Sequence, residues 1–202
     1  MSRCRHMARV VANSVGLVAT NSMPSIPASR ISGVVDYARF PAGSTLQIQS
    51  SLFTSYNTCT VALGAWTTVP NMSVSITPKR SNSKFRIDIR WGGECGASAW
   101  DNVFAISRSG TIINLPTQEG TRMGAVGMPL QTYIDDDNNS TLEYSCFSTI
   151  DTPNTGSTIT YSMVGQAWSS RTLYTGCVVG YTTDAANYER ISNEIIVTEI
   201  AV

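Results

Sequence analysis

The clearest pattern in the chain is the strict alternation of apolar and charged side chains between Phe85 and Trp91. One face of this segment carries the apolar residues Phe85, Ile87, Ile89 and Trp91. The other face carries the charged residues Arg86, Asp88 and Arg90. Because successive side chains of a β-strand point to opposite sides, this period of two predicts a strand with one buried face.

The same short period recurs along most of the chain after Thr45. It predicts further strands at Leu46–Gln49, Thr58–Leu63, Trp66–Val69, Val74–Ile76, Asn102–Ser107, Thr111–Ile113, Leu142–Phe147, Ile159–Met163, Leu173–Tyr174 and Glu194–Ile200. Turn-forming residues lie between them, at Ser109–Gly110, Asp135–Asn139 and Pro153–Gly156. The Gly- and Met-rich segment Met123–Leu130 fits either a long loop or a helical turn. This succession of short strands predicts an all-β protein built as an antiparallel β-sandwich.

The first 44 residues follow a different pattern. Residues 1–23 form a basic and then weakly apolar leader, whose apolar stretch is interrupted by Asn13 and Ser14. We therefore expect neither a signal peptide nor a membrane span there. Helix and central strand are both disfavoured further on by Pro24, Pro27, Gly33, Pro41 and Gly43. The sequence predicts an extended N-terminal arm at 1–44, with a strand-like segment Gly33–Tyr37, and a sandwich domain at 45–202.

Composition narrows the class of protein. The 202 residues are 42% hydrophobic, which is enough for the core of one compact domain. Only 14% are charged and the net charge is zero, which argues against a nucleic-acid binder. The 25 Ser and 23 Thr suit turns and exposed strand faces, so the surface is polar with little charge.

The chain is poor in the residues that nucleophilic catalysis requires. Its one histidine, His6, lies in the leader, so the predicted domain has no imidazole base for a serine or cysteine nucleophile. The five cysteines are Cys4, Cys59, Cys95, Cys146 and Cys177, and their spacing fits neither a zinc ribbon nor a dense disulfide framework. We interpret them as reduced thiols that pack as small apolar groups, although the sequence is compatible with one disulfide.

Acidic residues offer other chemistry. A pair of carboxylates for polysaccharide cleavage could come from Glu94, Asp101, Glu119 and Glu143, but no spacing singles out two of them. Asp135–Asn139 offers oxygen ligands, yet Ser140 and Cys146 stand where a calcium loop has Gly and Glu. We therefore expect no catalytic residue, no metal and no cofactor.

Aromatic residues are open to two interpretations. They could pack in the core or at a subunit interface, or they could contact a sugar or a protein. The residues concerned are Trp91, Trp100, Trp168, Tyr133 and Tyr174.

Three parts of the sequence are more specific than an alternating pattern. The run Asp151–Tyr161 contains a Pro-Asn turn, in which Gly156 is expected to supply a positive φ, and the chain closes on Ile195–Val202. The second is Val74–Ile89, with Thr-Pro-Lys-Arg-Ser-Asn-Ser-Lys at its centre, and the third is Ile26–Gly33 with Phe40–Ile48. Together they resemble the C-terminal domain of small bacteriophage virion fibre proteins and the segments that end fibre shafts.

The resemblance implies a fold and a function. It implies a jelly-roll-like sandwich, a homotrimer and an arm that binds tail, baseplate or capsid proteins of a virion assembled in the host cytoplasm. The sandwich would face outward and attach to a glycan or protein of the host surface, without enzymatic activity. Because no long shaft precedes residue 24, we expect a short fibre, a distal piece or a head decoration. The alternatives are a capsid decoration protein, a polysaccharide-cleaving appendage and a cellular carbohydrate-binding module.

The closing strand is the predicted subunit interface. Ile196, Thr198 and Ile200 share one face of it, and the other face carries Ile195, Val197, Glu199 and Ala201. Both faces are largely apolar, which suits a strand covered on both sides. The resemblance implies that the second cover is a neighbouring subunit near a three-fold axis, so Ile196, Thr198 and Ile200 are the predicted trimer contacts.

Overall fold

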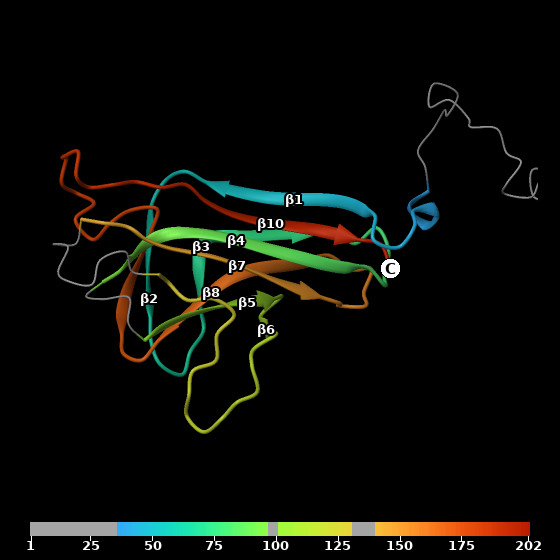
Figure 1. Ribbon diagram of the computed structural model, residues 1–202, viewed down its shortest axis with the longest axis horizontal. Helices are drawn as coiled ribbons and strands as arrows, with labels where there is room; N and C mark the ends of the chain where they lie inside the picture. The colour runs from blue at the N-terminus through green and yellow to red at the C-terminus, as the bar shows by residue number, and fades with distance from the viewer. Residues whose placement is uncertain (1–35, 97–100, 131–139) are drawn as a thin grey trace, which may run out of the picture. The chain divides into compact units, whose positions relative to one another are not determined.

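In the computed structural model, residues 36–96, 101–130 and 140–202 are described, and they form two antiparallel β-sheets (Figure 1). A short 3-10 helix, η3 (Tyr37–Arg39), comes before the first strand. The strands are β1 (Thr45–Phe53), β2 (Asn57–Val61), β3 (Thr67–Ile76), β4 (Lys84–Cys95), β5 (Asn102–Arg108), β6 (Thr111–Ile113), β7 (Glu143–Asp151), β8 (Ile159–Ala167), β9 (Arg171–Thr175) and β10 (Asn193–Ile200). The predicted β-sandwich is therefore confirmed.

The strand order is that of a jelly roll. One sheet has the order β1-β10-β4-β7, because β7 pairs with β4 from Phe85 to Gly93. The short strand β9 pairs with the last residues of β4, and β2 pairs with β9. The other sheet has the order β3-β8-β5-β6. Strands that are distant in sequence thus lie side by side, as in the two Greek keys of a jelly roll. The short strands β2 and β9 are additions to that frame.

The alternating segments of the sequence form the strands, with informative differences in length. The segments predicted as Trp66–Val69 and Val74–Ile76 join into the single strand β3, whose pairing with β8 shifts between Thr68 and Ser73. Asn71 within the shift has φ 63°, so an irregularity accommodates Pro70 where two strands were expected. Met123–Leu130 forms a loop without a helical turn. The leader, most of the predicted arm and residues 33–35 of its strand-like segment Gly33–Tyr37 lie outside the described residues. The end of that segment is not a strand, because Tyr37 begins η3.

The core fills the space between the sheets. Its largest fully buried side chains are Trp91, Tyr161, Phe85, Phe104, Met72, Ile76, Ile87, Ile106, Met163, Leu173 and Ile195. The apolar face of Phe85–Trp91 that the sequence predicts is buried in this core. Trp91 packs edge-on against Phe104 from the other sheet, with ring centroids 4.9 Å apart, and donates its indole N–H to Thr175 Oγ1. Trp91 is therefore a core residue.

A buried polar cluster joins the two sheets near one end of the sandwich. The carboxylate of Asp151 accepts a hydrogen bond of 2.7 Å from the Tyr161 hydroxyl and forms an ion pair of 2.9 Å with Arg108. Burial and this hydrogen bond raise the pKa of Tyr161 above its ordinary value. In the turn between Asp151 and β8, Asn154 has the positive φ, of 49°, and not Gly156 as predicted. Asn tolerates this conformation because its short polar side chain bonds locally.

The strand registers give the sandwich two distinct ends. At one end, which we call the junction end, Thr45 pairs with Ile200, Ile200 with Lys84, and Phe85 with Asp151. The chain enters β1 here through η3, and the C-terminus leaves β10 here (Figure 1). The opposite end, the loop end, carries the connections that follow β1, β4 and β9.

The loop end depends on two strands that approach each other closely at Gly93. A Cβ built on Gly93 would lie 1.9 Å from the Tyr174 carbonyl oxygen and 2.7 Å from Trp91 Cζ2. We expect Gly93→Ala to lower the free energy of unfolding by about 3 kcal/mol, because backbone has to move. Gly156→Ala is the matched control: its Cβ would meet nothing within 4 Å, and we expect a change within about 1 kcal/mol. Urea unfolding of both variants measures the difference; equal losses would contradict the close approach.

Candidate functional site

The junction end is organised by Arg80 in the turn between β3 and β4. Its guanidinium group donates to the Tyr37 and Phe40 carbonyl oxygens and, at 3.5 Å, to the Val202 carbonyl oxygen. Lys79 lies over the Tyr37 ring, 5.2 Å from its centroid. One side chain thus holds the entry of the chain into the sandwich and its C-terminus together. Tyr37–Val202 accordingly form one compact unit.

Arg80 is itself positioned by a buried carboxylate, that of Glu199 on β10, which is 0% exposed. Glu199 accepts hydrogen bonds from the backbone N–H groups of Lys79, at 2.8 Å, and Arg80, at 3.1 Å. The Ser83 hydroxyl and the Gln47 amide each donate to it at 2.6 Å. A buried charge is tolerated only when its acceptor sites are filled, and here donors from β1 and from the β3–β4 turn fill them.

The Glu199 cluster makes a sharp prediction about stability. We expect Glu199→Gln to lower the free energy of unfolding by about 2–3 kcal/mol, because its amide N–H₂ group would face donors in place of an acceptor. Glu194→Gln is the control on the same strand, since Glu194 makes only a 3.6 Å ion pair with Arg90 and should change stability by less than about 0.5 kcal/mol. Urea unfolding measures both, and equal effects would reject the role of Glu199.

The predicted trimer contacts lie on the side of the six-stranded sheet that faces away from the core, which we call the outer face. Ile196, Thr198 and Ile200 are half-buried there, while Ile195, Val197 and Glu199 point inward and are buried. The register aligns Thr198 with Ile48 of β1 and with Arg86 of β4, and Arg86 with Ile150 of β7. The structure therefore brings all three predicted residues onto one surface.

The outer face combines exposed apolar side chains with paired charges. Ile48, Leu52 and Ile150 are 59%, 58% and 49% exposed. Between them lie two ion pairs, Arg86 with Asp88 at 2.9 Å and Arg90 with Glu194 at 3.6 Å. The surface is thus apolar in part, and its opposite charges are already paired.

The four acidic candidates do not share one environment. Glu94 and Glu143 are buried, and their carboxylates accept hydrogen bonds from the backbone N–H groups of Val179 and Cys95 respectively. Glu119 is exposed and pairs with Arg122 at 3.1 Å, and Asp101 is exposed in a turn. Two of the acids therefore organise backbone in the fold. Asp135–Asn139 lies outside the described residues, and among those described no cluster of three or more metal-ligating side chains occurs.

The four described cysteines are unpaired thiols in different surroundings. Cys95 and Cys177 are buried, Cys59 is half-buried and Cys146 is exposed. Burial raises the pKa of Cys59 and of Cys177 to about 11. Burial and the neighbouring Glu143 carboxylate raise the pKa of Cys95 well above its ordinary value. These three thiols stay protonated at neutral pH, in agreement with the interpretation of the cysteines as packed, reduced thiols. Cys146 does not fit that interpretation, because it is exposed. Cys4 lies outside the described residues.

An aromatic cluster forms at the loop end from three segments. Tyr181 of the β9–β10 connection packs against Tyr56 after β1, with ring centroids 5.0 Å apart, and against Tyr174 of β9, at 6.0 Å. The guanidinium carbon of Arg190 lies 4.4 Å from the Tyr56 ring centroid. Of the aromatic candidates, only Tyr174 is in this cluster: Trp91 is buried, Trp168 is 59% exposed elsewhere, and Trp100 and Tyr133 are not among the described residues.

The β9–β10 connection, residues 176–192, is fixed against the outer face of β4. The buried Glu94 carboxylate accepts from Val179 N–H, and Gly176 N–H donates to the Gly92 carbonyl oxygen at 2.8 Å. Gly92 leaves room for Ile191, whose Cγ2 would lie 2.5 Å from any Cβ at that position. Arg190 Nε donates to the Gly176 carbonyl oxygen at 3.2 Å and so closes the base of the loop.

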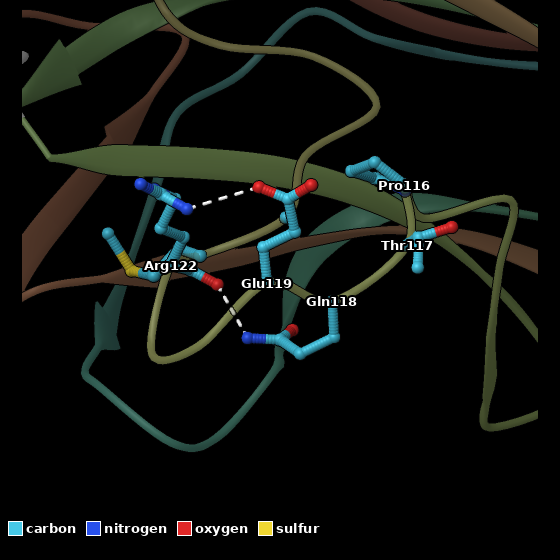
Figure 2. Close-up of a pocket in the computed structure, with 7 residues that line it drawn as sticks. Pro116, Thr117, Gln118, Glu119 and Arg122 are labelled. Atoms are coloured by element: carbon cyan, nitrogen blue, oxygen red, sulfur yellow. Dashed lines mark hydrogen bonds and ion pairs between the residues drawn. The ribbon is translucent and has the colours of Figure 1, made fainter.

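Two shallow pockets lie in connections of the sandwich. One, of about 380 Å³, is formed by the loop at residues 116–124, where Glu119 and Arg122 bind each other and Gln118 donates to the Arg122 carbonyl oxygen (Figure 2). Its charged groups therefore satisfy one another. The other, of about 230 Å³, is lined by Tyr181, Thr182, Thr183, Asp184, Ala185, Tyr188 and Arg190. It adjoins the tyrosine cluster at the loop end.

Comparison with known proteins adds no relative to this picture: no protein-family model matches the chain, and no curated protein matches it either. Over the described residues, no helix is long and apolar enough to cross a membrane. The functional interpretation therefore depends on the sequence motifs and on the geometry of the two ends.

Proposed function

We propose that the chain is a non-enzymatic structural protein of a bacteriophage virion, a short fibre that attaches by its N-terminal arm and presents a trimeric sandwich to the host surface. The observation that carries this proposal is that the two ends of the sandwich differ in what they hold. The chain enters beside its own C-terminus at the junction end, where Arg80 binds Tyr37, Phe40 and Val202. The tyrosine cluster lies at the opposite end. Such a molecule is suited to be held at one end and to bind at the other.

The contacts between the resembling motifs support the same proposal. The Thr-Pro-Lys-Arg turn and the Val-Thr-Glu-Ile strand are far apart in sequence, yet Glu199 accepts from Lys79 and Arg80. Asp151 and Tyr161, at the two ends of the run that opens the first motif, bind each other at 2.7 Å. These described residues of the first and second motifs therefore share a role in securing the ends of strands.

The outer face is the surface that would form the trimer. Ile48 and Leu52 on β1 extend the apolar row of Ile196, Thr198 and Ile200, and burial of an exposed apolar side chain contributes about 1.5–3 kcal/mol. Its charges occur as opposite pairs, and the net charge of the chain is zero, so a second and third copy meet little repulsion.

The proposed trimer predicts a specific effect of charge on the outer face. Light scattering of the wild-type chain should give about three times the 21.8 kDa mass of one chain at micromolar concentration. Ile48→Asp should shift it to monomers while the fold is retained, because Ile48 is exposed within one subunit and shares its row with Arg86. Leu63→Asp, at a 49% exposed apolar residue in the turn between β2 and β3, should leave the trimer intact. A monomeric wild type would reject the trimer and favour the binding-module alternative.

Attachment through the arm is tested by deletion. Removing residues 1–35 leaves η3 and the Arg80 contacts in place, so the remaining chain should fold and give the far-UV circular dichroism spectrum of a β-sheet protein. We expect this truncated protein to be lost from particles assembled in infected cells, measured by immunoblotting of purified virions. Normal incorporation of the truncated protein would show that the arm is not the anchor.

A further inference from the structure

We propose that the pocket at the loop end, between Tyr181 and Tyr188, binds a single ring of a neutral sugar. This inference deepens the proposed attachment function and rests on it for its biological meaning. It begins from the composition of the pocket, whose lining combines two aromatic residues, Tyr181 and Tyr188, with the polar residues Thr182, Thr183 and Asp184.

The size of the pocket favours a small ring. At about 230 Å³ it lies below the range of pockets that hold drug-sized molecules. A protein partner would have to cover roughly 800 Å² of surface in a stable complex, far more than this pocket offers. One pyranose ring has suitable dimensions, because its C–H face can lie on a tyrosine ring while its hydroxyls reach polar groups at the edge.

The charges of the pocket favour a neutral ligand. Arg190 and Asp184 both line the pocket and carry opposite charges, and Arg190 lies over Tyr56 and donates through Nε to the Gly176 carbonyl oxygen. Asp184 is exposed and makes no ion pair with any described residue. Its carboxylate would accept hydrogen bonds from sugar hydroxyls and would repel a carboxylate or phosphate.

The pocket is also held in shape before any ligand arrives. Backbone hydrogen bonds from Tyr181 to Val178, Thr183 to Gly180 and Tyr188 to Ala185 form successive turns within the loop. The loop is fastened to β4 through Glu94 and Gly92, as described above. A ligand that binds a preformed loop loses less free energy to ordering it. A long connection without regular structure inside a compact domain is often functional.

Saturation-transfer difference NMR on the chain of 202 residues tests the proposal. The probes are the methyl glycosides of glucose, galactose, mannose, rhamnose and N-acetylglucosamine, with methyl glucuronide as the acidic comparator. We expect transfer to the ring protons of at least one neutral glycoside and weaker binding of the glucuronide. The absence of transfer to all five neutral glycosides would overturn the proposal, as would tighter binding of the glucuronide.

Variants locate the binding in the pocket. Tyr181→Ala should weaken the affinity for the bound glycoside by about tenfold or more, because the stacking face is lost. Tyr181→Phe keeps the ring and should bind like the wild type, which separates stacking from damage to the loop. Asp184→Asn should weaken neutral-sugar binding and reduce the discrimination against the glucuronide. Tyr144→Ala, at a 45% exposed tyrosine on β7, is the control and should change nothing. Equal affinity of wild type and Tyr181→Ala would overturn the assignment.

Two further results separate this proposal from the proposed function. Tyr181→Ala should still be incorporated into virions, because incorporation depends on the arm. If the wild-type chain is incorporated normally but binds none of the neutral glycosides, only the pocket proposal is rejected and the proposed function stands. Binding to host cells that depends on Tyr181, survives periodate treatment and is lost on protease treatment would assign the pocket to a protein partner and overturn the sugar.

Discussion

The described sandwich depends on one buried carboxylate, that of Glu199. Its inward position on β10 places a negative charge among apolar side chains, and this is stable only because donors from β1 and from the β3–β4 turn converge on it. The turn is thereby fixed, and Arg80 on it can reach the backbone of η3 and the C-terminus. The direction in which the chain enters the sandwich therefore follows from the charge of one side chain on the last strand.

Alternation of side chains was sufficient to predict most strands, because a jelly roll with one buried face per sheet repeats the period of two in almost every segment. It failed where the backbone departs from regular geometry: β3 continues through Pro70 and Asn71, and the positive φ after Asp151 belongs to Asn154. The junction was missed for a different reason. Residues 37–44 lack a period, and their place in the compact unit comes from Arg80, which is distant in sequence.

The candidate sites, too, could be predicted only where they depend on the alternation within one strand. Ile196, Thr198 and Ile200 were correctly placed on one face because a strand fixes which side chains alternate. The tyrosine cluster could not be predicted, since Tyr56 and Tyr181 meet only after the register has brought the ends of β1 and β9 to one end of the sandwich. The Glu199 cluster, in contrast, left a signal in the sequence. Glu199 shares one face of the closing strand with Ile195 and Val197, and a single carboxylate on a buried face indicates that a polar partner from another part of the chain binds it.

The neighbouring positions of η3 and Val202 also bear on how this domain could be engineered. Since the two ends of the compact unit meet at Arg80, a short linker could join them, and new termini could be opened in the exposed part of the β9–β10 connection. A circularly permuted domain of this kind would carry a fused peptide at the end remote from η3. A peptide fused to Val202 itself would instead emerge beside the point where the chain enters the sandwich.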